Sequence, residues 1–116
     1  MGRPARLLLL RIIATDRTFE QVSHRGTPCW EGKCIHCNRR LRLTLAGEPI
    51  SRATVEHIRP RSHGGDDALT NLAVACSRCN HGKGARLDRR RRGDPRLEEV
   101  IAATLERRRS RWRDPD

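Results

Sequence analysis

Residues 54–84 read TVEHIRPRSHGGDDALTNLAVACSRCNHGKG, and this stretch carries most of the information about the fold. It begins with a run rich in β-branched residues, passes through a loop rich in glycine and aspartate, and returns to an apolar run that ends in a Cys-x-x-Cys pair. These patterns predict a strand over residues 52–58, a loop over 59–71, a strand over 72–76 and a helix that continues to about residue 86.

The second cysteine pair has a partner earlier in the chain. Cys34 and Cys37 form one Cys-x-x-Cys pair and Cys76 and Cys79 form the other, with 38 residues between the pairs. Two such knuckles from separate elements can close a tetrahedral zinc site. A disulfide framework is the alternative, but the count of five cysteines is odd and no convincing secretory signal precedes them. We interpret the fifth cysteine, Cys29, as a small buried hydrophobic residue or a free thiol.

The rest of the chain carries weaker signals. Asp16 or Thr18 can cap a short helix that carries Phe19 and Val22, and Asp94 followed by proline is a typical helix start. Residues 40–45 alternate between polar and apolar side chains, which predicts a half-buried strand. We divide the chain into three parts: a mainly helical N-terminal flank (1–28), a core with the knuckles (29–88), and a basic linker with a C-terminal amphipathic helix (89–116).

Composition restricts the partners. The 116 residues include 25 Lys or Arg, of which 23 are arginines, against 14 Asp or Glu, for a net charge of +11. This balance favours nucleic acid as the partner, with the arginine run at 89–92 and the C-terminal arginines as backbone contacts. Three aromatic residues are too few for a platform that stacks single-stranded bases. The apolar run at 7–14 is interrupted by Arg11 and is too short to span a membrane, so we expect a cytoplasmic protein.

An acidic residue and a histidine, Glu56 and His57, lie side by side at the end of a predicted strand. Asn71 and Asn80 follow at 14 and 23 residues after this histidine. A hard cation such as Mg²⁺ prefers oxygen ligands, which Glu56 and Asn80 can supply, and a neutral histidine can take a proton from water. These residue types suit metal-assisted hydrolysis of a phosphodiester, with nearby arginines balancing charge on the phosphate.

The whole pattern over residues 34–84 closely resembles the HNH endonuclease family. The resemblance rests on the Glu-His-Ile-x-Pro stretch, the Gly-Gly loop, Asn71 with the following leucine, and Cys-x-x-Cys-Asn with a Lys-Gly after it. It implies an α+β chain with a small ββα-metal fold, stapled by a structural four-cysteine zinc site and flanked by N- and C-terminal helices. The zinc of this branch of the family is structural, and a separate Mg²⁺ or Mn²⁺ ion is catalytic.

The resemblance also implies roles for individual residues. His57 matches the general base, Asn71 the asparagine that braces the loop, and Glu56 and Asn80 the ligands of the catalytic metal. Aspartate is common where this chain has Glu56, and His81 follows Asn80, so either Asn80 or His81 can be the second ligand. The candidates for contacts with phosphate are Arg59, Arg61 and Lys83. We expect His36, inside the first knuckle, to face solvent.

Two functions are consistent with these residues. The first is a metal-dependent DNA endonuclease, for which the family implies products with 5′-phosphate and 3′-hydroxyl ends. The second is a zinc-dependent module that binds nucleic acid without cutting it. RNA carries the same phosphates as DNA, so the sequence does not separate the two substrates, and the chain can act as a monomer or a homodimer.

Overall fold

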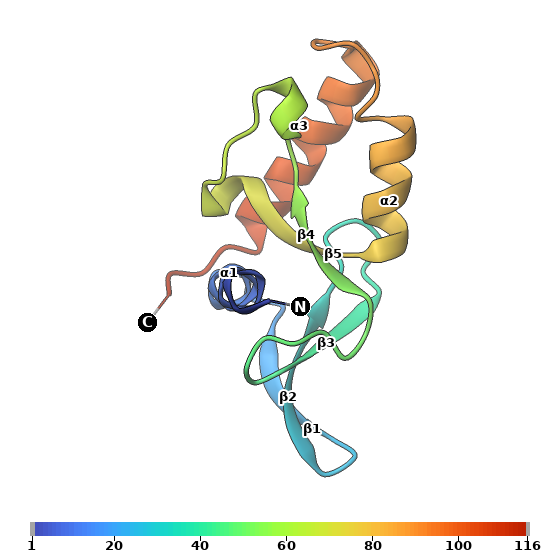
Figure 1. Cartoon of the computed structure of the whole chain (residues 1–116). Helices are drawn as coiled ribbons and strands as arrows, with labels where there is room; N and C mark the ends of the chain where they lie inside the picture. The colour runs from blue at the N-terminus through green and yellow to red at the C-terminus, as the bar shows by residue number, and fades with distance from the viewer. Residues whose placement is uncertain (1, 116) are drawn as a thin grey trace.

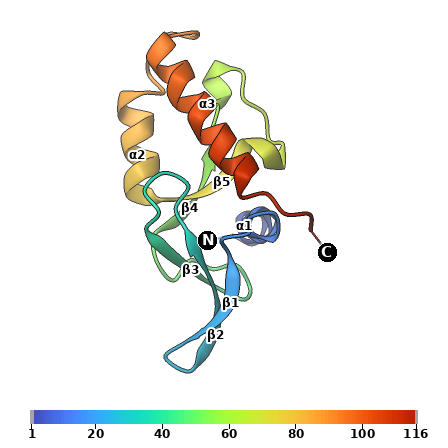
Figure 2. The ribbon, with the colours of Figure 1, turned by 180° about the vertical axis from the view of Figure 1, so that it is seen from behind.

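The computed structural model describes residues 2–115, which form an elongated α+β molecule of 46 × 27 × 25 Å (Figures 1 and 2). No helix in this part of the chain combines the length and the apolar character needed to cross a membrane. The elements are, in chain order, α1 (Arg3–Ala14), β1 (Glu20–His24), β2 (Thr27–Lys33), β3 (Arg40–Thr44), β4 (Ala53–His57), the 3₁₀ turns η1 (Arg61–His63) and η2 (Leu69–Asn71), β5 (Leu72–Cys76), α2 (Ser77–Arg86) and α3 (Pro95–Ser110).

The strands form two separate antiparallel sheets. The first has the order β1-β2-β3, and its β1–β2 hairpin extends away from the helices at one end of the molecule (Figure 1). The second pairs β4 with β5, so that His57 lies opposite Leu72 and Ala53 lies opposite Cys76. Helix α2 begins directly after β5. The predicted strands near residues 40–45, 52–58 and 72–76, and the helix after them, are therefore confirmed.

Strand β5 lies at the centre of the core, and all five of its residues are buried. Helix α1 packs against it, with Leu9, Ile12 and Ile13 buried on one helical face. Leu97 and Ile101 of α3 join the same cluster. Because β5 is covered so completely, its continuous apolar run is explained by burial, and the cysteine at its end is held in a fixed position.

The helix expected around Phe19 and Val22 is wrong, because this segment is the start of a hairpin. Asp16 caps a turn instead of a helix: its Oδ1 accepts hydrogen bonds from the backbone N–H and the hydroxyl of Thr18. Val22 then pairs with Cys29 of β2. Phe19 is fully buried against Gly32, where an added Cβ would lie 2.4 Å from the ring. The division of the chain into three parts stays a prediction, with α1 as the helix of the first part.

Helix α3 begins as its sequence indicates. The carboxylate of Asp94 accepts hydrogen bonds from the backbone N–H groups of Arg96 (3.0 Å) and Leu97 (3.1 Å), and Pro95 occupies the first turn. These contacts satisfy two of the N–H groups that a helix leaves free at its start. They also lower the pKa of Asp94, with the bond from Leu97 as the largest cause.

Most arginines at the end of α3 and just after it are internal connectors, which corrects the expectation that the whole basic tail contacts nucleic acid. The exposed Arg109 is the exception within α3. Arg108 is fully buried and donates to the carbonyl oxygens of Leu72 (2.7 Å), Thr15 (3.0 Å) and Leu69 (3.1 Å). Arg107 donates to the carbonyl of Ile35, Arg111 to those of Lys33 and Cys34, and Arg113 to those of Ile13, Ala14 and Phe19. These guanidinium groups join the end of the chain to α1, β5 and the first knuckle.

The buried Arg108 gives a stability prediction. Arg108→Met keeps a long side chain but leaves three backbone carbonyls and the Thr15 hydroxyl without their donor. We expect the free energy of unfolding to fall by about 3 kcal/mol, since buried acceptors that lose a charged donor cost about this much. Urea unfolding followed by circular dichroism measures the change.

The neighbouring Arg109 provides the control. Its side chain is 78% exposed and, within residues 2–115, forms an ion pair with Glu106, one turn earlier on the same helix. Arg109→Met should change stability by less than about 0.5 kcal/mol, as is usual for surface substitutions. Equal losses in the two variants would contradict a specific role for Arg108.

Candidate functional site

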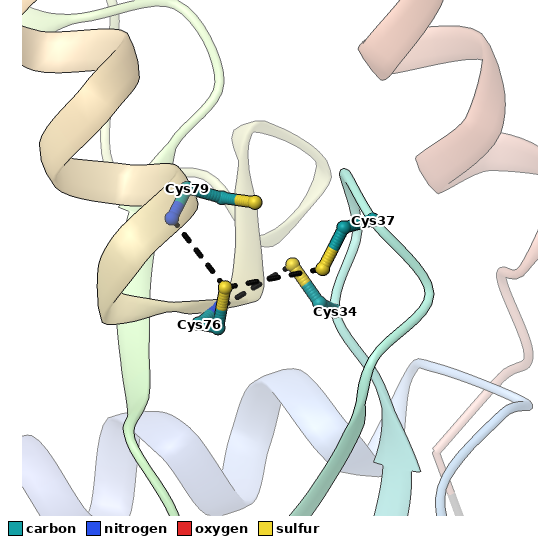
Figure 3. Close-up of side chains that lie close together, drawn as sticks. All are labelled: Cys34, Cys37, Cys76 and Cys79. Atoms are coloured by element: carbon teal, nitrogen blue, oxygen red, sulfur yellow. Dashed lines mark hydrogen bonds between the residues drawn. The ribbon is translucent and has the colours of Figure 1, made fainter.

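The four knuckle cysteines converge on one point. Cys34 and Cys37 come from the segment between β2 and β3, Cys76 ends β5, and Cys79 lies in the first turn of α2 (Figure 3). Their sulfur atoms all lie within 4.8 Å of one another, and the Sγ atoms of Cys37 and Cys76 are 3.9 Å apart. In a tetrahedral zinc site with Zn–S bonds of about 2.3 Å, two sulfurs lie about 3.8 Å apart. The cluster therefore has the dimensions of a zinc site, as the sequence predicted.

Backbone N–H groups point at these sulfurs. The Sγ of Cys34 accepts from the N–H of His36 (3.4 Å) and from that of Cys76 (3.3 Å), and the Sγ of Cys76 accepts from the N–H of Cys79 (3.4 Å). Such bonds orient the sulfurs and stabilise thiolates. Burial raises the pKa of Cys34, so binding of a cation has to displace its proton.

The cysteines form no disulfide: all five lie in the described residues and all are free. Cys29 is buried in the middle strand of the first sheet, opposite Val22 and Thr44. It lies outside the sulfur cluster. Its place in the core fits the interpretation of a small buried hydrophobe.

Glu56 is the carboxylate at the centre of the predicted active site, and only 1% of its side chain is exposed. It lies near the end of β4 and faces inward. Lys83 of α2 places its Nζ 3.7 Å from Oε1, and the Nε2 atom of His36 directly contacts Oε2. Burial raises the pKa of Glu56 to about 7, and the charge of Lys83 opposes this increase.

His57 is the last residue of β4 and faces away from Glu56, because successive side chains in a strand point to opposite sides. A quarter of its side chain is exposed. Its Nε2 lies 2.7 Å from Oδ1 of Asp67, and the same oxygen accepts a hydrogen bond from Arg61 at 2.9 Å. These two donors lower the pKa of Asp67, with the bond from His57 as the largest cause.

Asn71 holds the loop after β4 through three side-chain hydrogen bonds. Its side-chain oxygen accepts from the N–H of Arg59 (2.9 Å), and its side-chain nitrogen donates to the carbonyls of Arg59 (3.1 Å) and Asp66 (2.8 Å). The loop also needs Gly65, because a Cβ there would lie 1.8 Å from the carbonyl oxygen of Arg59. The backbone that follows His57 is therefore held at both of its ends.

Asn80 and His81 differ clearly in position. Asn80 lies in α2, and its side-chain nitrogen donates to the hydroxyl of Thr54 and to the carbonyl of Val55, both at 3.1 Å. Both bonds use the nitrogen, so they leave the side-chain oxygen, the ligating atom of an amide, uninvolved. The side chain lies over β4 next to the residue that precedes Glu56. His81 is exposed on α2.

Two sequence expectations fail at this site. Lys83 does not face a phosphate: it is almost fully buried, with its Nζ 2.8 Å from Oδ1 of Asp88 and 3.4 Å from the carbonyl oxygen of His57. His36 does not face solvent: its imidazole is turned toward Glu56, and burial lowers its pKa to about 4. Sequence reasoning also missed Asp67, for which the only signal was its place in the Gly-rich loop.

The two candidate arginines have different partners. Arg59 forms a bidentate ion pair with Glu98 of α3, at 2.9 and 3.0 Å. Arg61 stays 69% exposed beside Asp67. Of the two, Arg61 therefore has the more accessible charge near His57.

The molecule has an antiparallel strand pair that leads into a helix, and an acid-histidine pair ends the first strand. A four-cysteine cluster consistent with a zinc site lies at the junction, and together these features define a ββα domain. Residues 34–86 match the family model for the HNH endonuclease. This segment is an HNH endonuclease family domain, which makes it a phosphodiester hydrolase by family. No curated protein and no solved structure matches the chain.

Zinc removal gives the prediction for the cysteine cluster. We expect elemental analysis to find one zinc ion per chain. We expect Cys76→Ser to lose this zinc together with most of the folded structure, because metal binding in small domains is largely folding free energy. Circular dichroism with and without a chelator measures the loss. Cys29→Ala is the control and should keep its zinc, since Cys29 lies outside the cluster. Full zinc content in Cys76→Ser would contradict the assignment.

Proposed function

We propose that this protein is a metal-dependent endonuclease that cuts DNA by hydrolysis, with His57 as the general base. The observation that carries the proposal is the position of His57 within the HNH family domain: a partly exposed imidazole at the end of β4, next to a buried carboxylate. The expected products carry 5′-phosphate and 3′-hydroxyl ends.

Glu56 and the residues around it offer donor atoms that suit a divalent cation. Glu56 offers a carboxylate and Asn80 an amide oxygen, both hard donors of the kind that Mg²⁺ and Mn²⁺ bind. The ammonium of Lys83 lies 3.7 Å from Oε1 of this carboxylate and repels a second cation there, which leaves Oε2 as the oxygen with the weaker competition. When bound, the divalent ion supplies charge stabilisation for the phosphate and the leaving oxygen.

The contact with Asp67 supports a specific role for the imidazole of His57. An ionised carboxylate only accepts hydrogen bonds, so the proton between the two groups belongs to Nε2. The neutral ring then has its lone pair on Nδ1. We assign Nδ1 as the atom that takes the proton of the attacking water, while the water oxygen bonds to phosphorus and the bond from phosphorus to the 3′ oxygen breaks. The leaving 3′ oxygen takes a proton from solvent and becomes the hydroxyl.

Arg61 and the exposed run at residues 89–92 are the proposed contacts with the DNA backbone. Arg61 lies next to Asp67 and thus close to His57. The run at 89–92 is exposed between α2 and α3. Arg59 reaches a phosphate only by releasing Glu98. Contacts of this kind are made to phosphates and not to bases. The affinity for DNA should therefore fall steeply as the salt concentration rises.

Plasmid cleavage tests the proposed reaction. With Mg²⁺ or Mn²⁺, the zinc-loaded chain should nick or cut supercoiled DNA, and His57→Ala should lower the rate at least 100-fold, because general bases contribute about 10²–10⁴-fold. His24→Ala, which changes a histidine in the β1–β2 hairpin, should leave the rate unchanged. Salt-sensitive binding without cleavage in any divalent metal would favour the non-catalytic module instead, and equal rates for wild type and His57→Ala would refute the assignment.

A second prediction separates Asn80 from His81. Asn80→Ala removes an oxygen donor beside β4, so we expect the Mn²⁺ concentration for half-maximal cleavage to rise at least tenfold. His81→Ala should leave that concentration unchanged, because His81 lies exposed on α2. Zinc content and circular dichroism confirm that both variants are folded. The reverse result would assign the ligand to His81.

A further inference from the structure

His36 occupies an unusual place for a residue between two knuckle cysteines. Such a residue is free to point away from the metal, yet here the imidazole turns to the carboxylate of Glu56, with its Nε2 in direct contact with Oε2. Its side chain is 17% exposed, whereas that of Glu56 is 1% exposed. The sulfur cluster does not use this side chain, and neither does the proposed base His57.

The two oxygens of Glu56 have different neighbours. On the Oε1 side, Lys83 is 4% exposed and is fixed by Asp88 and by the carbonyl of His57. On the Oε2 side lies His36, whose ring is the more exposed of the two neighbours. Of the two neighbours, solvent therefore reaches mainly the imidazole, on the Oε2 side of Glu56.

We propose that His36 and Glu56 together ligate the divalent cation, with His36 Nε2 and Glu56 Oε2 as the donor atoms. This inference rests on the proposed nuclease function and adds a nitrogen donor to its metal site. Two side chains that already meet at one point need little movement to bind one ion between them. The first knuckle would then serve two metals, zinc through Cys34 and Cys37 and the second cation through His36.

The charges around this point are consistent with a divalent ion. Glu56 and Asp88 each carry one negative charge when ionised, and Lys83, Arg107 and Arg111 each carry one positive charge. Four thiolates with one zinc ion carry two negative charges, and a neutral imidazole carries none. The group thus has a net charge of −1. A divalent cation brings it to +1, which the single negative charge of one phosphodiester balances.

A nitrogen donor changes which metals the site prefers. Imidazole suits Ni²⁺ and Zn²⁺ best, and Mn²⁺, although it also binds oxygen donors, accepts a nitrogen ligand more readily than Mg²⁺ does. The inference therefore predicts a site that binds Mn²⁺ more tightly than Mg²⁺, with the preference set by His36.

Electron paramagnetic resonance with Mn²⁺ on the zinc-loaded chain tests this without reference to activity. Bound Mn²⁺ should show electron spin echo modulation from a directly coordinated imidazole nitrogen. The modulation should disappear in His36→Gln and persist in both His57→Ala and His81→Ala. His36→Gln should also weaken Mn²⁺ binding at least tenfold and Mg²⁺ binding much less, because the amide oxygen of glutamine can replace the nitrogen for Mg²⁺.

The outcomes separate this inference from the function on which it rests. One outcome is that Mn²⁺ binds with no nitrogen modulation, and that Glu56→Gln abolishes binding while His36→Gln does not. His36 is then not a ligand and the inference is wrong, although the proposed metal site at Glu56 stands. If Mn²⁺ does not bind to the wild type at all, the metal site of the proposed function fails as well. Zinc content confirms that each variant is folded. The wild-type modulation together with its persistence in both His57→Ala and His81→Ala supports the inference even if His36→Gln does not fold.

Discussion

Four sulfur atoms, two from the segment after β2 and two from the junction of β5 with α2, lie close enough for one metal ion to bind them all. This contact joins the three-stranded sheet to the β4–β5 pair, which share no hydrogen-bonded strand. A bond from the N–H of Ile35 to the carbonyl of Val74 reinforces the junction. In a chain with three aromatic residues and a modest core, a metal bound there would supply stability that packing alone does not provide.

Buried arginine side chains connect further parts of the structure. The guanidinium groups of Arg107, Arg108, Arg111 and Arg113 bind backbone carbonyls of segments far away in the sequence. A guanidinium has five donors in a planar fork, so one side chain can satisfy several buried carbonyls at once. Part of the +11 charge is therefore structural. The charge left for nucleic acid lies in exposed residues such as Arg61 and the run at 89–92.

Local patterns in the sequence were sufficient to predict β3, β4, β5, α2, α3 and the cysteine cluster, because alternation, capping and Cys-x-x-Cys spacing act over a few residues. The β1–β2 hairpin was missed, since Asp16 and Thr18 can start a helix or close a turn and only pairing with β2 decides between them. Contacts around the site were missed for a similar reason. No local pattern shows that His36 and Lys83, 47 positions apart, meet at Glu56.

The alternation of side chains in β4 explains how one adjacent pair of residues can have two tasks. Glu56 faces the interior, where the first knuckle and α2 surround its carboxylate, and His57 faces the surface, where Asp67 holds its ring. A buried carboxylate needs positive charge nearby to stay ionised, and Lys83 provides it from α2. A general base needs access to water, which the exposed side provides. The strand therefore places the proposed cation ligand and the proposed general base on its two opposite sides.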